Sequence, residues 1–162
     1  NDIYIMDKAE PLPELNGIMC VKEPDNKSSN IFRKSNNLIP SYPYFNSGVI
    51  MCDNIHASKI CDYMIFRVKN GILAKGKNTD NMMLNEYLIE KKNEINFQAI
   101  NEKWNYMPFI SKNIKKIYPN FYHFVGKAGK ELISLYLELK KKEPKLNIEY
   151  FISNAEINLP LP

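Results

Sequence analysis

Short apolar runs separated by polar segments predict a chain in which strands alternate with helices. Runs rich in β-branched and aromatic residues predict five strands, which fall within residues 2–7, 17–23, 41–54, 95–100 and 120–126. Apolar residues at three- and four-residue spacing predict three helices, over residues 58–69, 80–91 and 130–142. This alternation is typical of the α/β class.

The polar segments between these elements are expected to be irregular. An Asn- and Ser-rich stretch, residues 24–43, predicts a long loop of the kind that carries function in compact domains. Pro144 ends the last predicted helix, because proline cannot continue a helix. The pattern therefore predicts one domain over residues 1–143, followed by an irregular tail over residues 144–162.

Composition supports a folded domain. The 162 residues are 44% hydrophobic and 25% charged, which argues against disorder and suits a domain with a real core. Cys20, Cys52 and Cys61 have no CxxC spacing, so reduced, buried thiols are expected rather than disulfides. No run of about 18 apolar residues suggests a membrane span. The chain opens on a strand-like run without a basic leader or an initiating Met, so no signal peptide is expected, and either a chain cut from something longer or one whose beginning is missing is predicted.

The charge is distributed unevenly. Lys and Arg number 22 against 18 acidic residues, a net charge of +4, and the lysines concentrate in the C-terminal half. An anionic partner such as phosphate or a membrane surface fits that half, and a solvated helix face is the simpler interpretation of the last cluster, residues 140–145. Nucleic acid is not favoured as a partner, because the chain has only two arginines and no binding motif.

Five polar residues stand at ends of predicted strands and helices, where ligands bind in α/β sheets. Four of them also have a purely structural interpretation. Asp7 could begin a turn, Asn46 could form a strand bulge, Asp80 could be a first-turn acid stabilised by the helix dipole, and His123 could be a hydrogen-bonded core histidine. The five residues are Asp7, Asn46, Asp80, Asn81 and His123.

Four segments, in order, carry a resemblance to a known family. "YFNSGVIMCDN" resembles the segment "YFNAGV", "TDNMMLN" resembles "DQDILN", "INEKWNYMP" resembles "LPxxWN", and "FYHFVGKAGK" resembles the signature "HyxGxxKPW". These segments cover roughly residues 41–130. They are similar to glycosyltransferase family 8, which includes bacterial lipopolysaccharide galactosyl- and glucosyltransferases and the glycogenins.

The resemblance implies a fold and an activity. The fold would be GT-A-like (Rossmann-like), a mixed sheet flanked by helices, here lacking its N-terminal part. The activity would be that of a retaining hexosyltransferase, which moves glucose or galactose from a UDP-sugar to a glycan or a lipid-linked acceptor in lipopolysaccharide or other cell-envelope synthesis. Its cofactor would be Mn²⁺ or Mg²⁺, and its place the cytoplasm or the inner face of the membrane.

The resemblance also implies roles for residues of the donor site. Asn46 would face the sugar nucleotide, and Ser47 and Gly48 would leave room for it beside the strand. Asp80 would contact the transferred sugar. Asn81 stands where the family has Gln and would lie near the anomeric carbon, one methylene short of the family's reach.

The implied metal and diphosphate sites depart from the family pattern. Asp7 and His123 would bind the metal, but Ala9 replaces the second acid of the family's Asp-x-Asp. The resemblance also implies that Gly126 approaches the phosphates and that Lys127 or Lys130 holds them. These departures favour the alternative of a catalytically impaired domain that binds sugar or a protein partner.

Overall fold

The computed structural model describes residues 3–71, 79–108, 119–124 and 126–158. The chain forms two compact units rather than one: residues 11–102 are the larger unit, and residues 1–10 together with 103–162 are the smaller. A short 3₁₀ helix, η1 (Glu102–Trp104), contains the point in the sequence where one unit gives way to the other.

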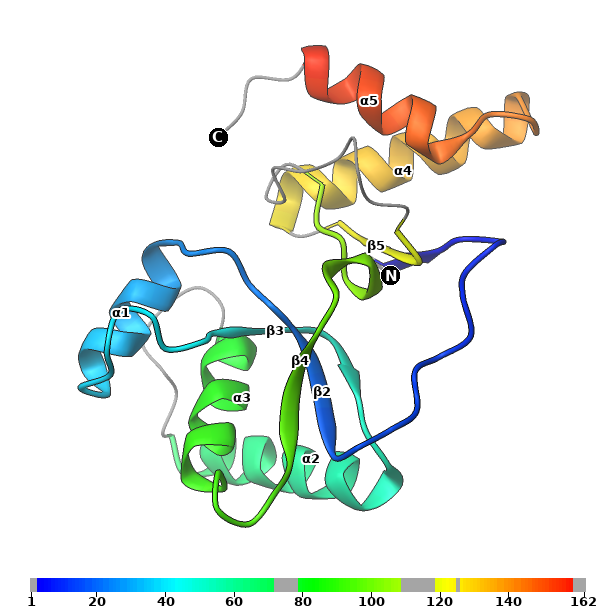
Figure 1. Ribbon diagram of the computed structural model, residues 1–162. Coiled ribbons are helices and arrows are strands. Elements are labelled where there is room, and N and C mark those ends of the chain that lie inside the picture. The colour runs from blue at the N-terminus through cyan, green and yellow to red at the C-terminus, as the bar shows by residue number, and fades with distance from the viewer. Residues whose placement is uncertain (1–2, 72–78, 109–118, 125, 159–162) are drawn as a thin grey trace. The chain divides into compact units, whose positions relative to one another are not determined.

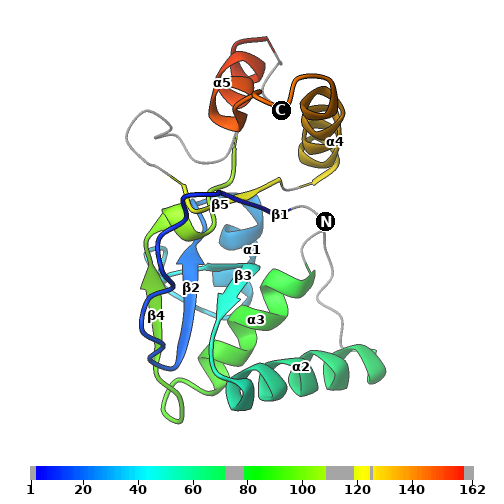
Figure 2. The same cartoon turned by 90° about the vertical axis from the view of Figure 1, so that its right-hand side faces the viewer.

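The larger unit is built on a mixed three-stranded sheet. Its strands are β2 (Ile18–Lys22), β3 (Phe45–Met51) and β4 (Phe97–Ile100), in the order β3-β2-β4 (Figure 2). The central strand β2 runs antiparallel to β3 and parallel to β4. Its first four residues are buried, as expected of a strand with neighbours on both sides. This sheet, with its helices, confirms the predicted α/β class.

Helix α3 (Thr79–Glu90) packs along β3 and against α2 (Asn54–Lys69) (Figure 1). The residues of α3 that the pattern placed inward are all buried, and three of them, Leu84, Tyr87 and Leu88, belong to one apolar cluster with residues of the sheet. That prediction is confirmed for Met83, Leu84, Tyr87 and Leu88.

Helix α2 differs from its prediction in start and in exposure. It begins at Asn54 because the Asp53 carboxylate accepts the His56 N–H at 2.8 Å and caps the helix. Of its predicted apolar stripe only Ile60 is buried, whereas Cys61 and Val68 are exposed. The expectation of buried thiols therefore holds for Cys20 but is wrong for Cys61.

The predicted long loop at residues 24–43 contains a helix, α1 (Lys27–Ser35). Asn26 and Ser29 form a reciprocal capping box at its start. The buried Arg33 anchors its last turn, by donating to the Tyr42 carbonyl at 2.8 Å and pairing with Asp25 at 2.6 Å. Side-chain anchoring of this kind stabilises a polar nine-residue helix that has no apolar stripe from which it could be predicted.

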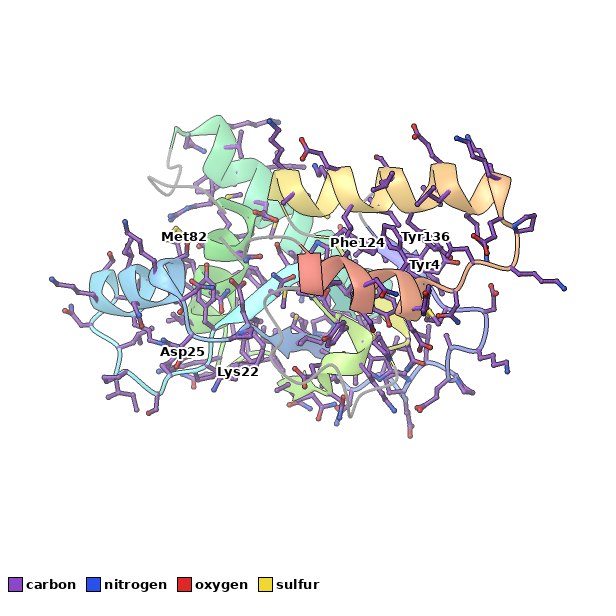
Figure 3. The ribbon with its side chains drawn as sticks, turned by 90° about the horizontal axis from the view of Figure 1, so that it is seen from above. Tyr4, Lys22, Asp25, Met82, Phe124 and Tyr136 are labelled. Atoms are coloured by element: carbon purple, nitrogen blue, oxygen red, sulfur yellow. The ribbon has the colours of Figure 1, made fainter. Side chains whose placement is uncertain are left out.

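The smaller unit pairs β1 (Ile3–Ile5) with β5 (Phe121–His123) in an antiparallel ribbon. Helices α4 (Gly126–Lys142) and α5 (Ile148–Asn158) complete it (Figure 1). Tyr4 of β1 and Tyr136 of α4 meet edge to face, with ring centroids 5.5 Å apart (Figure 3). The rest of the core surrounds this pair and is formed by Tyr106, Tyr122, Phe124, Leu132, Ile133, Ile148 and Ile152.

The expected irregular tail is wrong, because α5 lies within residues 144–162. Pro144 does end α4, but the chain turns and Asn147 then starts a new helix by accepting the N–H groups of Glu149 and Tyr150. Ile148 and Ile152 bury one face of that helix in the core. Throughout the part of the chain that is described, every helix is too short or too polar to cross a membrane.

Candidate functional site

A bulge in β3 explains why Asn46, Ser47 and Gly48 interrupt its apolar run. Ile50 lies opposite Cys20, but Phe45 lies opposite Lys22. Five steps along β3 therefore correspond to two along β2, so three extra residues must leave the ladder. The structural interpretation of this stretch as a bulge is thus confirmed.

The side chain of Asn46 turns into the protein and stabilises the bulge. Its Oδ1 accepts the Gly48 N–H at 2.8 Å, and its Nδ2 donates to Oε2 of Glu23 at 3.1 Å. Asn46 is only 4% exposed. Both ends of its carboxamide are therefore engaged inside the protein, and Gly48, rather than Asn46, is exposed at this point of the strand.

Glu23 is at the centre of the site, although it was not among the predicted residues. It directly follows β2, and its buried carboxylate accepts from the Nδ2 groups of Asn46, Asn81 (2.7 Å) and Asn26. Burial raises the pKa of Glu23, the hydrogen bonds from Asn46 and Asn26 lower it, and the nearby Asp80 carboxylate raises it, with a net shift upward. Glu23 directly follows an apolar strand, and the same sequence feature made Asp7 a candidate.

The first turn of α3 brings two predicted residues to the bulge. Asn81 Oδ1 accepts the Ser47 N–H at 2.7 Å, and Ser47 Oγ lies 2.5 Å from both Asn81 Oδ1 and Asp80 Oδ2. With one hydroxyl proton, Ser47 donates to one of these oxygens at a time. Asp80 is exposed and lies in the first turn of the helix, where the positive end of the dipole stabilises a carboxylate. We call Glu23, Asn26, Asn46, Ser47, Asp80 and Asn81 the amide cluster.

Asn85, one turn further along α3, attaches the helix to β3. Its Oδ1 accepts the Phe45 N–H and its Nδ2 donates to the Phe45 carbonyl, both at 2.8 Å. The same Nδ2 group also reaches the Asn81 carbonyl at 2.7 Å. Sequence reasoning did not single out this residue, although Asn81 and Asn85 are four apart and so share one helix face.

The surface that the amide cluster offers to a ligand consists of the Asp80 carboxylate, the partly buried Ser47 hydroxyl and the exposed Gly48. Carboxylate and hydroxyl oxygens are suited to the hydroxyl groups of a sugar. Two carboxyl groups, Glu23 and Asp80, make the same surface unfavourable for direct contact with phosphate. The arrangement suits a neutral ligand rich in hydroxyl groups better than an anionic one.

The smaller unit does not bring Asp7 and His123 together. Ile3 lies opposite His123 and Ile5 opposite Phe121, so Asp7 continues past the end of the ribbon that is remote from His123. Asp7 lies in a turn closed by the Ala9 N–H and the Met6 carbonyl at 3.0 Å, and it lines a pocket of about 380 Å³. The ring of His123 is buried. The turn matches the structural interpretation of Asp7, and burial places His123 in the core.

The predicted metal site therefore does not fit the residues present. Asp7 and His123 are at opposite ends of a ribbon, and Ala9 supplies no ligand. Among the described residues, no three His, Cys, Asp or Glu side chains lie close enough together to hold a metal ion. No step of the chemistry is assigned to a metal here.

The predicted phosphate-binding residues surround the start of α4. Gly126 begins the helix with φ of +71°. Lys127 is 90% exposed and 3.8 Å from Glu131, and it lines an open groove of about 720 Å³ together with Gly126 and Lys130. A helix N-terminus with two lysines suits an anion, although Glu131 and Glu138 in the same groove oppose it. These residues belong to the smaller unit, whereas the amide cluster belongs to the larger.

Comparison of the chain with protein-family models gives no match, and comparison with curated proteins and with solved structures gives none either.

Proposed function

We propose that the chain is part of a retaining hexosyltransferase with a GT-A-like fold, which transfers glucose or galactose from a UDP-sugar to a glycan or lipid-linked acceptor. The observation that carries the proposal is the amide cluster, because it joins Asn46, Asp80 and Asn81 in one hydrogen-bonded group. These three come from two of the four segments that resemble the family. The resemblance names them as residues of one site, and they lie in one compact unit.

In the proposed reaction, the bond from the anomeric carbon to the diphosphate oxygen breaks and a bond to the acceptor oxygen forms. The proton of the acceptor hydroxyl passes to the departing diphosphate, and UDP leaves. Asp80 is the exposed carboxylate of the cluster and contacts the transferred sugar in this proposal. Asn81 holds Ser47 and the bulge rather than reaching outward, because its carboxamide is bonded at both ends.

A second candidate function is sugar or partner binding without transfer. It is favoured by the separation of Asp7 from His123 and by Ala9. The amide cluster needs neither residue, so a sugar could be bound where no diphosphate is activated. In both candidates three exposed lysines, Lys141 and Lys142 in the last turn of α4 and Lys145 after it, are proposed to contact anionic headgroups at the inner face of a membrane. Sedimentation with anionic vesicles at low and high salt tests that contact.

The decisive experiment measures release of UDP from UDP-glucose and UDP-galactose, with and without Mn²⁺. The variants are Asp80→Asn and, as a matched control, Asp62→Asn on the exposed side of α2. A transferase is expected to lose at least about 100-fold in rate with Asp80→Asn, because an interaction made at the reacting sugar is removed. Asp62→Asn is expected to have no effect.

A thermal-shift measurement with the same ligands separates the two candidates. Stabilisation by UDP-sugar without any turnover supports the binding domain, because a ligand that binds only the folded state raises its stability. Equal rates for Asp80→Asn and the unchanged chain would contradict a role for the amide cluster. Absence of both turnover and stabilisation would contradict both candidates.

A further inference from the structure

We propose that Glu23 is a positioning residue: its ionised carboxylate fixes the side chains of Asn46 and Asn81, and through them the bulge that presents Ser47, Gly48 and Asp80. Glu23 itself is buried and contacts no ligand in this proposal. Its influence on activity rests on the proposed function, whereas its influence on the geometry of the bulge does not.

The carboxylate determines the orientation of two carboxamides at once. Glu23 Oε2 accepts from Asn46 Nδ2 at 3.1 Å and from Asn81 Nδ2 at 2.7 Å. Because both NH₂ groups face Glu23, both Oδ1 atoms face the strand, where they accept the backbone N–H groups of Gly48 and Ser47. A carboxamide turned by half a rotation would place an NH₂ group against those N–H groups. The bulge therefore depends on a pure acceptor at position 23.

Only the ionised form of Glu23 is a pure acceptor. The hydrogen bonds to its carboxylate come from the side chains of Asn26, Asn46 and Asn81, and all three are NH₂ donors. A protonated carboxyl group would direct an O–H donor into this set of donors, and one of the contacts would be lost. The geometry alone thus predicts that acid loosens the amide cluster.

The surroundings of Glu23 determine the pH at which this occurs. Asp80 faces it from α3 and Tyr44 from the start of β3, while the cap of α1 contributes the neutral Asn26; Arg33 of α1 pairs instead with Asp25. Burial is the largest influence and raises the pKa of Glu23 above its ordinary value of 4.5. As the pH falls, the carboxylate is therefore lost at a higher pH than an unperturbed glutamate carboxylate would be.

The test follows the side-chain amide resonances of Asn26, Asn46 and Asn81 by ¹H–¹⁵N NMR between pH 7.5 and pH 4. All three are expected to shift together with one apparent pKa above 4.5, because one carboxylate holds them. Asp80→Asn is expected to keep this common titration, since Asp80 only perturbs it. Asp62→Asn serves as the matched control and is expected to leave it unchanged.

Glu23→Gln removes the titrating group and is expected to abolish the common shift while placing an NH₂ group among donors. The measurement on the unchanged chain does not depend on that variant folding. Independent titration of the three amides, or a common titration that persists in folded Glu23→Gln, would overturn the proposal. A common titration that disappears with Asp80→Asn would overturn it also, because Asp80 would then be the responsible group.

A kinetic measurement adds the functional consequence. UDP release is expected to fall on the acid side with the same apparent pKa as the amide resonances, mainly through kcat, and Glu23→Gln is expected to lose this limb. If the amides titrate together and no UDP-sugar is turned over at any pH, the proposed function fails and the positioning role stands. If UDP is released and its rate is indifferent to pH across the amide titration, the positioning role in catalysis is overturned.

Discussion

At the scale of the residue, asparagine side chains provide the hydrogen bonds that backbone pairing cannot provide in a bulged strand. Where β3 leaves the ladder, its N–H and C=O groups have no partner on β2. A carboxamide carries both donors and an acceptor, so Asn46, Asn81 and Asn85 can satisfy these groups and one another. The polarity that interrupts the apolar run is therefore structural as well as a candidate for function.

The variant Asn85→Ala tests whether such a carboxamide stabilises the protein. The change removes three hydrogen bonds and leaves the buried N–H and C=O of Phe45 without their partner. We expect the free energy of unfolding to fall by about 2–4 kcal/mol, because each unsatisfied buried group costs roughly 1–3 kcal/mol. Urea denaturation measures the loss.

Asn93→Ala is the control for this variant, since Asn93 is exposed in the turn after α3. A change of about 0.5 kcal/mol or less is expected there. If the two variants were equally stable, the carboxamide of Asn85 would not be holding α3 to β3.

At the scale of the element, the ends of helices and strands are determined by single residues. Asn26 and Asn147 cap α1 and α5, the two helices that the sequence pattern did not predict. Gly17 determines where β2 begins: its φ is +75°, and Ile18 then donates to the Asn96 carbonyl at 2.9 Å, which starts the parallel pairing with β4. A Cβ at Gly17 would lie 2.1 Å from that carbonyl oxygen.

Gly17→Ala and Gly71→Ala form a matched pair at this scale. Both glycines have positive φ, but a Cβ at Gly71 would meet nothing within 4 Å. We expect Gly71→Ala to cost about 1 kcal/mol, from backbone conformation alone. Gly17→Ala is expected to cost at least about 2–3 kcal/mol, because the clash is with backbone that cannot move aside.

Chemical denaturation of both variants measures the difference. Equal losses would show that the cost of a Cβ at position 17 comes from the backbone conformation and not from the contact with Asn96.

At the scale of the whole molecule, the chain has separate cores. One apolar cluster belongs entirely to the smaller unit and includes Ile152, and another belongs entirely to the larger unit and includes Leu84. Each unit therefore has its own source of apolar stabilisation. The smaller unit is assembled from both ends of the described chain, since β1 pairs with β5.

Core truncations are expected to act on one unit at a time. Ile152→Ala and Leu84→Ala each remove a fully buried side chain, and each should cost about 2–5 kcal/mol in its own unit. Hydrogen exchange with mass spectrometry is expected to show lost protection in residues 103–158 for the first and in residues 17–100 for the second.

Tyr150→Ala is the control in α5, because Tyr150 is 67% exposed and its removal should change little. Loss of protection throughout the chain in either core variant would mean that the two cores unfold as one.

The sequence by itself determined the elements with clear periodicity. Strands β1 to β5 and helices α2 to α4 lie where the apolar pattern predicted them, although α2 and α4 begin earlier than expected. Helix α1 was missed because its stability comes from caps and anchors, such as Arg33 on the Tyr42 carbonyl, which leave no periodic trace in the sequence. Helix α5 was missed although Ile148, Phe151, Ile152 and Ala155 have the spacing of a buried helix face, because an irregular tail was predicted after Pro144.

The tertiary structure alone decided which polar residues meet. The sequence singled out Asn46, Asp80 and Asn81, and the fold joins them, but it adds Glu23 and Asn85 and separates Asp7 from His123. The physical reason is register: the bulge in β3 and the antiparallel pairing of β1 with β5 depend on contacts between segments far apart in the chain. Residue types determine which chemistry is available, and strand pairing determines which residues can share a site.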